Sequence, residues 1–245
     1  MTDIHCHILP NLDDGAETMA DAVVMARMAA DCGVRNIIAT SHFRGQASEL
    51  PRLSRFLRRL EALKEALGRE KIPVQVHPGA EILCLPETVE LARRGELPTL
   101  GHSRYVLCEF FFDAPYEYMD RILEGIAGSG YRVVVAHPER YEAIIRDPRG
   151  AQRWFRRGYL IQLNKGSILG AFGGRVQAVS RWLLDGGLVH MIASDAHSPR
   201  KRTTDLSLLE NWLLERYPKG YTDLLLKENP ARLLGDQDMV PAESF

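Results

Sequence analysis

The sequence contains no stretch long and apolar enough to cross a membrane, and it does not open with the charged segment and apolar core of a secretion signal. Its formal net charge is only -1, from 31 basic and 32 acidic residues. A chain balanced in this way has no overall field that would attract nucleic acid or an anionic lipid surface. These absences predict a cytoplasmic protein that neither inserts into a membrane nor binds nucleic acid.

Cysteine is scarce, and the four cysteines never stand at the C-x-x-C spacing of a redox or zinc motif. Each lies in or beside an apolar segment, so we predict that Cys6, Cys32, Cys84 and Cys108 are free thiols that behave as small buried hydrophobic residues. A thiolate nucleophile in a phosphate loop needs an arginine six positions later. The residues at those positions are Leu12, Ile38, Glu90 and Ala114. Cysteine-dependent phosphoryl chemistry is therefore excluded.

The common nucleotide, serine-hydrolase and zinc-protease motifs are also missing, since no G-x-x-x-x-G-K-[ST], G-x-S-x-G or H-E-x-x-H occurs. Short apolar runs instead alternate with amphipathic segments along most of the chain. Strands are expected at 2–8, 34–39, 74–80, 105–108, 132–136, 159–163 and 188–193. Helices are expected at 18–30, 53–67, 87–94, 118–128, between 139 and 157, at 176–185 and at 204–216.

Seven β/α units in succession predict an α/β fold with parallel strands and helical crossovers. A doubly wound open sheet would also fit this alternation. A distorted (β/α)7 TIM-like barrel is favoured, because no glycine-rich phosphate loop follows a strand and polar residues follow nearly every strand rather than one switch point. With no linker or low-complexity tract in the chain, we predict a single domain over residues 1–245.

Metal-ligand residue types stand at or just beyond the carboxyl end of six of the seven predicted strands. They are His5 and His7, His42, Glu81, Glu109, His137, and then Asp195 and His197; the remaining strand is followed by Asn164. The loop after the first strand adds Asp13 and Asp14. Because the carboxyl ends of parallel strands meet at one rim, these side chains are expected to share one cleft. His5 and His7 would meet there because the first strand ends and turns between them. The other histidines, His77, His102 and His190, are interpreted as structural.

So many imidazoles and carboxylates exceed the needs of one tetrahedral zinc ion, so we expect two or three divalent ions that share a carboxylate. Nitrogen and oxygen donors without thiolate suit manganese, iron or zinc better than calcium or magnesium. Arg140 and Arg202 lie close to these ligands in sequence. Cations would repel both arginines unless an anion sits between them, which indicates a phosphate-bearing substrate. The alternative is that both are ordinary surface residues.

With these residues in place, the chain resembles the polymerase and histidinol phosphatase (PHP) superfamily, and within it the manganese-dependent protein-tyrosine phosphatases of bacterial capsule and exopolysaccharide loci, the CpsB/YwqE type. The resemblance rests on Asp3-Ile4-His5-Cys6-His7-Ile8-Leu9-Pro10, Asp13-Asp14-Gly15, Thr40-Ser41-His42, Gly79-Ala80-Glu81-Ile82, Glu109-Phe110, Ala114-Pro115-Tyr116, Ala136-His137-Pro138-Glu139-Arg140-Tyr141, Ala193-Ser194-Asp195-Ala196-His197 and Glu228-Asn229-Pro230. Cys6 stands where the family usually has serine.

The resemblance implies a PHP-fold barrel with three metals, manganese being the expected ion. One metal would take His5, His7, Glu81 and Asp195; a second would share Glu81 and add Glu109 and His137; a third would take Asp14, His42 and His197, with Asp13 as a substitute for Asp14. It also implies hydrolysis of phosphotyrosine on the tail of a bacterial tyrosine autokinase that regulates capsular or exopolysaccharide synthesis.

In that mechanism a metal-bridging hydroxide would attack phosphorus while Arg140 and Arg202 stabilise the transition state. Two alternatives remain open: a small-molecule phosphatase of the same superfamily, of the histidinol-phosphate type, and a catalytically silent metal-binding regulator of the kinase. A helix bearing Arg52, Arg55, Arg58 and Arg59 could hold an acidic tail, or could be an ordinary solvated face balanced by Glu61 and Glu65.

Overall fold

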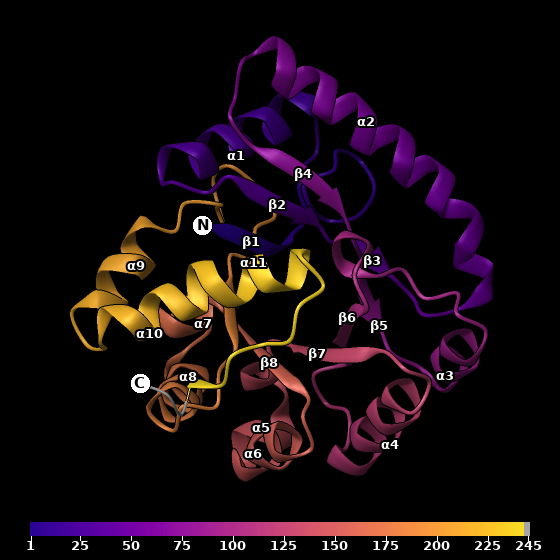
Figure 1. Ribbon diagram of the computed structural model, residues 1–245, viewed down its shortest axis with the longest axis vertical. Helices are drawn as coiled ribbons and strands as arrows, with labels where there is room; N and C mark the ends of the chain where they lie inside the picture. The colour runs from indigo at the N-terminus through magenta and orange to yellow at the C-terminus, as the bar shows by residue number, and fades with distance from the viewer. Residues whose placement is uncertain (243–245) are drawn as a thin grey trace.

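Parallel strands run through the middle of the molecule and helices lie around them, as the computed structural model shows (Figure 1). The structure describes residues 1–242, so the last three residues of the predicted 1–245 domain lie outside the described residues. No helix within residues 1–242 is long and apolar enough to cross a bilayer. The prediction of a mixed α/β fold with parallel strands is confirmed.

The strands form two sheets in which every neighbouring pair of strands is parallel. The first has the order β1 (Thr2–Cys6), β2 (Asn36–Ala39), β4 (Gln75–Pro78). The second has the order β3 (His42–Phe43), β5 (Glu81–Leu83), β6 (Tyr105–Glu109), β7 (Arg132–Ala136), β8 (Leu160–Asn164), β9 (Met191–Ala193).

Two of the seven predicted strands are each broken into two pieces, which explains why there are two sheets. The chain leaves β2 and resumes pairing as β3, and in the same way it leaves β4 and resumes as β5. At the other side, the Asp195 N–H donates to the His5 carbonyl at 2.9 Å, and the His7 N–H donates to the Ala196 carbonyl at 2.9 Å. The strands therefore occupy seven places around a ring that is distorted rather than a regular cylinder.

The breaks correct the predicted position of two site residues. Glu81 was expected just beyond a strand over 74–80, and His42 just beyond one over 34–39; each instead opens the short second piece of its strand. Gly79 lies in the break after β4, where a Cβ would be 2.5 Å from the Ile38 Cγ2 side-chain atom. Only glycine therefore fits at this position without displacing Ile38.

Helices follow the strands as predicted, with bounds that differ by a few residues. They are α1 (Met19–Asp31), α2 (Leu53–Arg69), α3 (Pro86–Arg93), α4 (Tyr116–Ala127), α5 (Glu142–Arg146), α6 (Arg149–Arg156), α8 (Gly174–Asp185) and α9 (Ser207–Leu214). Thr18 caps α1, its hydroxyl accepting a hydrogen bond from the Asp21 N–H at 3.1 Å. On α2, Leu60, Leu63 and Leu67 recur at helical spacing and are buried.

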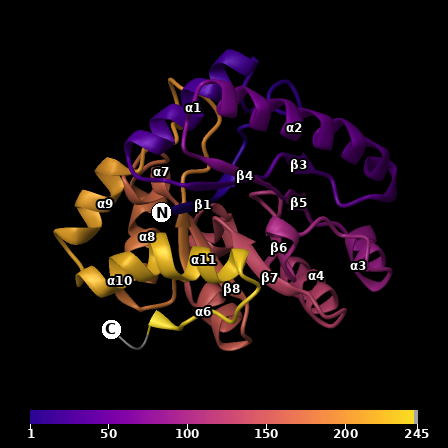
Figure 2. The same cartoon turned by 45° about the horizontal axis from the view of Figure 1, so that its top comes forward.

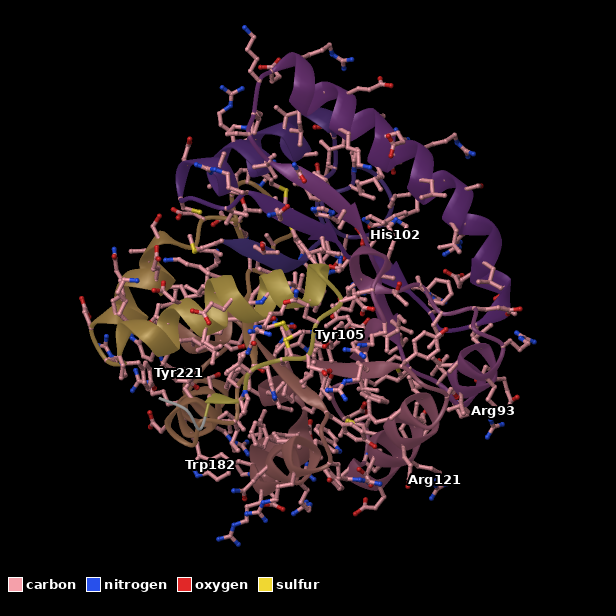
Figure 3. The ribbon with its side chains drawn as sticks, viewed as in Figure 1. Arg93, His102, Tyr105, Arg121, Trp182 and Tyr221 are labelled. Carbon is pink, nitrogen blue, oxygen red and sulfur yellow. The ribbon has the colours of Figure 1, made fainter. Side chains whose placement is uncertain are left out.

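Helices that the sequence did not predict are α7 (Lys165–Ile168), α10 (Lys219–Asp223) and α11 (Asn229–Leu234), the last two joined by a π-helical turn at Leu224–Glu228. Helix α11 lies beside β1 in both views (Figures 1 and 2). Its Leu233 packs into a buried cluster with Ile4 of β1 and Leu107 of β6. Tyr105, labelled in Figure 3, belongs to the same cluster and donates its hydroxyl to the Gln237 carbonyl at 2.7 Å. Side chains thus fill the interior, and the C-terminal segment packs against it.

Candidate metal centre

The structure brings together all nine side chains that the sequence predicted as metal ligands, along with both arginines. A cavity of about 240 Å³ is lined by Asp14, His42, Glu81, Glu109, Phe112, His137, Arg140, Asp195, His197 and Arg202. His5 and His7 lie beneath it, fully buried. Residues separated by almost the whole chain meet here because parallel strands end at the same rim.

The first close group consists of His5, His7, Glu81 and Asp195, whose candidate donor atoms all lie within 4.8 Å of one another. The Nε2 atoms of His5 and His7 are each 3.1 Å from Glu81 Oε2. Strand β1 ends at Cys6, between the two histidines. The expected turn is not what aligns them, however, since residues i and i+2 of a strand already share a face.

Two more close groups share residues with the first. One consists of His7, Asp14, His42 and His197, in which Asp14 Oδ1 lies 3.3 Å from the Nε2 atoms of both His42 and His197. The other consists of His42, Glu81 and Glu109, in which His42 Nδ1 lies 3.0 Å from Glu109 Oε1. Because His7, His42 and Glu81 recur between groups, cations held here would share ligands.

His137 lies beside Glu81, with its Nε2 atom 2.6 Å from Glu81 Oε1. In the third close group, however, the imidazole that accompanies Glu81 and Glu109 is that of His42. His137 has a left-handed backbone, with φ 34°, and its buried Nδ1 has no hydrogen-bond partner within residues 1–242. A buried ring nitrogen without a partner is costly and calls for a further ligand.

Asp13 and Asp14, which the sequence left as alternatives, have different surroundings. Asp14 faces the imidazoles of His42 and His197. Asp13 lies behind His7, where its Oδ2 is 2.8 Å from His7 Nδ1 and accepts the His42 N–H at 3.0 Å. A carboxylate that accepts from Nδ1 of a histidine fixes the other ring nitrogen as the one free to coordinate. With this geometry, Asp13 would orient the His7 ring if His7 binds a cation through Nε2.

A second positioning chain runs along β8, and sequence reasoning found only half of it. His5 Nδ1 lies 3.0 Å from Gln162 Oε1, and the Gln162 amide donates to Asn164 Oδ1 at 2.9 Å. The Asn164 amide in turn donates to the Asp195 carboxylate. Asn164 stood at a predicted strand end; Gln162, two residues earlier on the same face, was the missed signal.

The imidazoles and carboxylates of these groups shift one another's pKa values. Burial lowers the pKa of His7, but hydrogen bonds to Asp13 and Glu81 outweigh burial and raise it to about 10. Burial also lowers the pKa of His42, but hydrogen bonds to Asp14 and Glu109 outweigh it and raise this pKa to about 11. The pKa of Asp14 is lowered, chiefly by His197 and His42. Positive charge is therefore favoured at His7 and His42, whereas burial lowers the pKa of His197.

Both predicted arginines face the cavity. The Arg202 guanidinium pairs with the Asp195 carboxylate, and its Nε–H donates to the Asp195 carbonyl at 3.1 Å. Arg140 Nη1 lies 3.5 Å from Asp195 Oδ2. The Arg140 guanidinium lies between the rings of Phe112 and Phe172, 4.4 Å from each centroid, which fixes its plane. Neither phenylalanine was predicted, because nothing in local sequence links Phe112 or Phe172 to Arg140.

Residues predicted as structural lie apart from these groups. His77 Nε2 is 2.9 Å from Asn36 Oδ1, and His190 Nδ1 accepts the Ile161 N–H at 3.0 Å. Burial, with a smaller contribution from Arg132, lowers the pKa of His190 to about 4. All four cysteines are free, as predicted, but Cys32 is only half-buried, contrary to the prediction. Cys6 is buried and belongs to none of the three close groups found within the described residues.

A parallel α/β barrel with a rim of imidazoles and carboxylates is the architecture of a metal-dependent hydrolase. The family model described as capsular polysaccharide synthesis, CpsB/CapC, matches residues 1–235, and the chain belongs to this family.

Similar proteins carry consistent names. The chain is 36% identical over 240 residues to tyrosine-protein phosphatase YwqE of Bacillus subtilis, covering 97% of this chain and 92% of the relative. It is 31% identical over 228 residues to putative tyrosine-protein phosphatase CapC of Staphylococcus aureus, covering 92% and 87%. A solved structure from work on YwqE of Bacillus subtilis and CpsB of Streptococcus pneumoniae, described as unique metal-dependent tyrosine phosphatases, superposes with a TM-score of 0.85 at 33% identity. It covers 98% of this chain and 97% of its own.

Proposed function

We propose that this protein is a metal-dependent protein-tyrosine phosphatase, a phosphoric monoester hydrolase. One observation carries the proposal: three overlapping groups of histidines and carboxylates lie at one rim, and two guanidinium groups face the same cavity. Arginines beside a site built for cations need an anion between them. The names of the relatives, tyrosine-protein phosphatases over almost the whole chain, support phosphotyrosine as that anion.

The side chains fit divalent cations well. The donors are nitrogen and oxygen without thiolate, which suits manganese, the expected ion, or iron or zinc. Within residues 1–242, His137 Nδ1 has no hydrogen-bond partner. The Nε2 atoms of His5 and His7 face each other at 3.3 Å, an arrangement that a cation between them would relieve.

We propose two or three ions. His5, His7, Glu81 and Asp195 would hold one, Asp14, His42 and His197 a second, and Glu109 and His137, with a shared Glu81, a third. When bound, the ions would lower the pKa of a coordinated water molecule and offset the charge of the phosphate.

The chain's own residues would bind and orient the phosphate. Arg140 and Arg202, the proposed catalytic arginines, present N–H groups toward the cavity and would contact the phosphoryl oxygens, where charge develops in the transition state. Asp195, which now pairs with both guanidinium groups, would release them to the substrate. A phenol, with a pKa of about 10, departs more easily than an alkyl alcohol, so little protonation of the leaving group is required.

The partner that we propose is the phosphotyrosine-bearing tail of a bacterial tyrosine kinase that controls capsular or exopolysaccharide synthesis. Membership of a capsular polysaccharide family supports this assignment. A flexible tail can reach an open rim without unfolding a domain. The proposal keeps the cytoplasmic location that the sequence predicts.

Turnover of p-nitrophenyl phosphate and of a phosphotyrosyl peptide, with Mn²⁺ and after treatment with chelator, tests this function. Histidinol phosphate assayed beside them separates the small-molecule alternative. Arg202→Ala should lose most activity, whereas Arg200→Ala, in the same loop, should retain it; Arg200 does not line the metal-centre cavity. Full activity in metal-free protein, or binding of phosphopeptide without release of phosphate, would contradict the proposal.

A further inference from the structure

A second cavity lies directly beside the candidate metal centre. Its volume is about 190 Å³, and His42 lines both cavities, so the two share a wall. The loop after β1, the break between β2 and β3, and the start of α2 contribute its other walls, including Leu12, Phe43 and Leu53. It is therefore placed to receive a group that is attached to something bound at the metal centre.

The walls of this cavity suit an aromatic ring. Leu12, Phe43, Leu53 and Phe56 are apolar, and a cavity of roughly 150 Å³ already accepts benzene in another protein. Ser41 also lines it; this residue is only 7% exposed, and its Oγ has no hydrogen-bond partner within residues 1–242. A buried hydroxyl without a partner is uncommon in native proteins. The combination favours a ring that carries a polar edge, such as a phenol.

Charged residues also line the cavity. Arg55 lies on α2, whereas Arg52 lies just before α2 and pairs with Glu49, another lining residue, at 2.9 Å. The Arg55 guanidinium donates to the Asn11 carbonyl at 2.7 Å and so links α2 to the loop that carries Asp13 and Asp14. A peptide with one phosphate at the metal centre would be attracted by the Arg55 guanidinium as it entered, because the contact of Arg55 with the Asn11 carbonyl does not neutralise its charge.

We infer that this cavity is a subsite for a second aromatic side chain, tyrosine above all, from the same peptide whose phosphotyrosine lies at the metal centre. The inference rests on the proposed function and adds to it a preference for peptides in which another aromatic residue lies near the phosphotyrosine. Because His42 lines both cavities, one peptide can occupy the metal centre and this subsite together. Ser41 Oγ would form a hydrogen bond with the hydroxyl of the second tyrosine.

A peptide series combined with a variant that fills the cavity tests this inference. Phosphotyrosyl peptides of one composition would carry tyrosine, phenylalanine or alanine at each neighbouring position in turn, with p-nitrophenyl phosphate as a substrate that has no neighbouring residue. Leu53→Trp fills the cavity from α2, and Leu53→Phe is the milder alternative if tryptophan disturbs folding. Leu57→Trp is the matched control, because Leu57 lies on the same helix, is 50% exposed and does not line the cavity.

In the unmodified protein, kcat/KM for the best tyrosine-containing peptide should exceed that of its alanine counterpart about tenfold, as expected when an aromatic ring is buried on binding. Leu53→Trp should bring that ratio close to one and leave turnover of p-nitrophenyl phosphate unchanged, and Leu57→Trp should alter neither. Equal turnover of all peptides by the unmodified protein, or equal loss in both tryptophan variants, would overturn the inference. Failure of the unmodified protein on p-nitrophenyl phosphate would instead overturn the proposed function, and this inference with it.

Discussion

Asp13→Asn should weaken metal binding without removing a metal ligand. In the folded protein the Asp13 carboxylate serves three donors: its Oδ2 faces His7 Nδ1 at 2.8 Å and the His42 N–H at 3.0 Å, and its Oδ1 accepts the Gly15 N–H at 3.0 Å. Asparagine has nearly the same shape but only one acceptor oxygen. Its NH2 group must then face at least one of these donors, so two hydrogen-bond donors are placed against each other and that hydrogen bond is lost.

The size of the effect follows from what Asp13 does for His7. A carboxylate behind a coordinating histidine holds the ring in one orientation and raises its basicity, and losing it typically costs about 10–100-fold in metal affinity. That range corresponds to about 1.4–2.7 kcal/mol of binding free energy. Asp14→Asn should cost more than Asp13→Asn, because Asp14 itself lies in a group of candidate ligands.

Calorimetric titration of chelator-treated protein with Mn²⁺ measures these affinities directly, independently of catalysis. Glu17→Gln is the matched control, since Glu17 is an exposed acid that follows the same loop. Its affinity should equal that of the unmodified protein. The reasoning would be refuted if Asp13→Asn bound manganese as tightly as the unmodified protein, or if it lost more affinity than Asp14→Asn.

Three further predictions concern Arg140, the pH dependence of folding stability, and the buried Trp154. Arg140→Lys should lower kcat/KM about 10–100-fold, because an ammonium cannot replace a planar guanidinium held between two rings. Arg146→Lys, at an exposed residue of α5, is the control. Equal kcat/KM values for the two variants would contradict the prediction. In metal-free protein, His7 and His42 have pKa values of about 10 and 11, above the ordinary 6.5. Protonation of these two histidines stabilises the folded state fully below pH 6.5, and this stabilisation is lost as the pH rises through about 10 and 11. The free energy of unfolding in urea should therefore fall at high pH. A free energy of unfolding that does not change with pH would contradict this prediction. Trp154→Ala should cost about 3–5 kcal/mol in urea unfolding, since the ring is fully buried and its N–H donates to Asp120; a loss below about 1 kcal/mol would contradict this.

Strand positions were predictable from the sequence because continuously apolar runs bounded by polar residues have few alternatives in a parallel sheet. The run at Arg132–Ala136 matched the observed strand at both ends. The short α7 and the C-terminal α10 and α11 were not predicted. Segments of four to six residues such as these carry too little periodicity to identify, and tertiary packing, such as that of Leu233 against the strands, holds them in place.

The candidate ligands were predictable as a set, whereas their grouping was not. Residue type and position at a strand end suffice to nominate His42, Glu81 and His137 for one rim. Which of them lie within a common radius depends on backbone details that the sequence does not display. The break after β4 and the left-handed backbone at His137 both change where a side chain points. Asp13 and Asp14 show the same limit, since adjacent residues of identical chemistry differ only in the direction that a loop gives them.

The arginines illustrate why a physical argument about charge reaches further than a pattern. Arg140 and Arg202 were singled out because a guanidinium beside cations requires an anion, and both do face the cavity. What the argument could not supply was the means of holding Arg140 in place. Phe112 lies on the loop after β6, and Phe172 lies between α7 and α8, yet their rings enclose the same guanidinium. A stacked guanidinium keeps its charge while losing freedom to rotate, so its N–H groups would stay aligned with the phosphate that we propose Arg140 binds. Two segments, one after β6 and one between α7 and α8, thus hold the guanidinium group that we propose binds the phosphate.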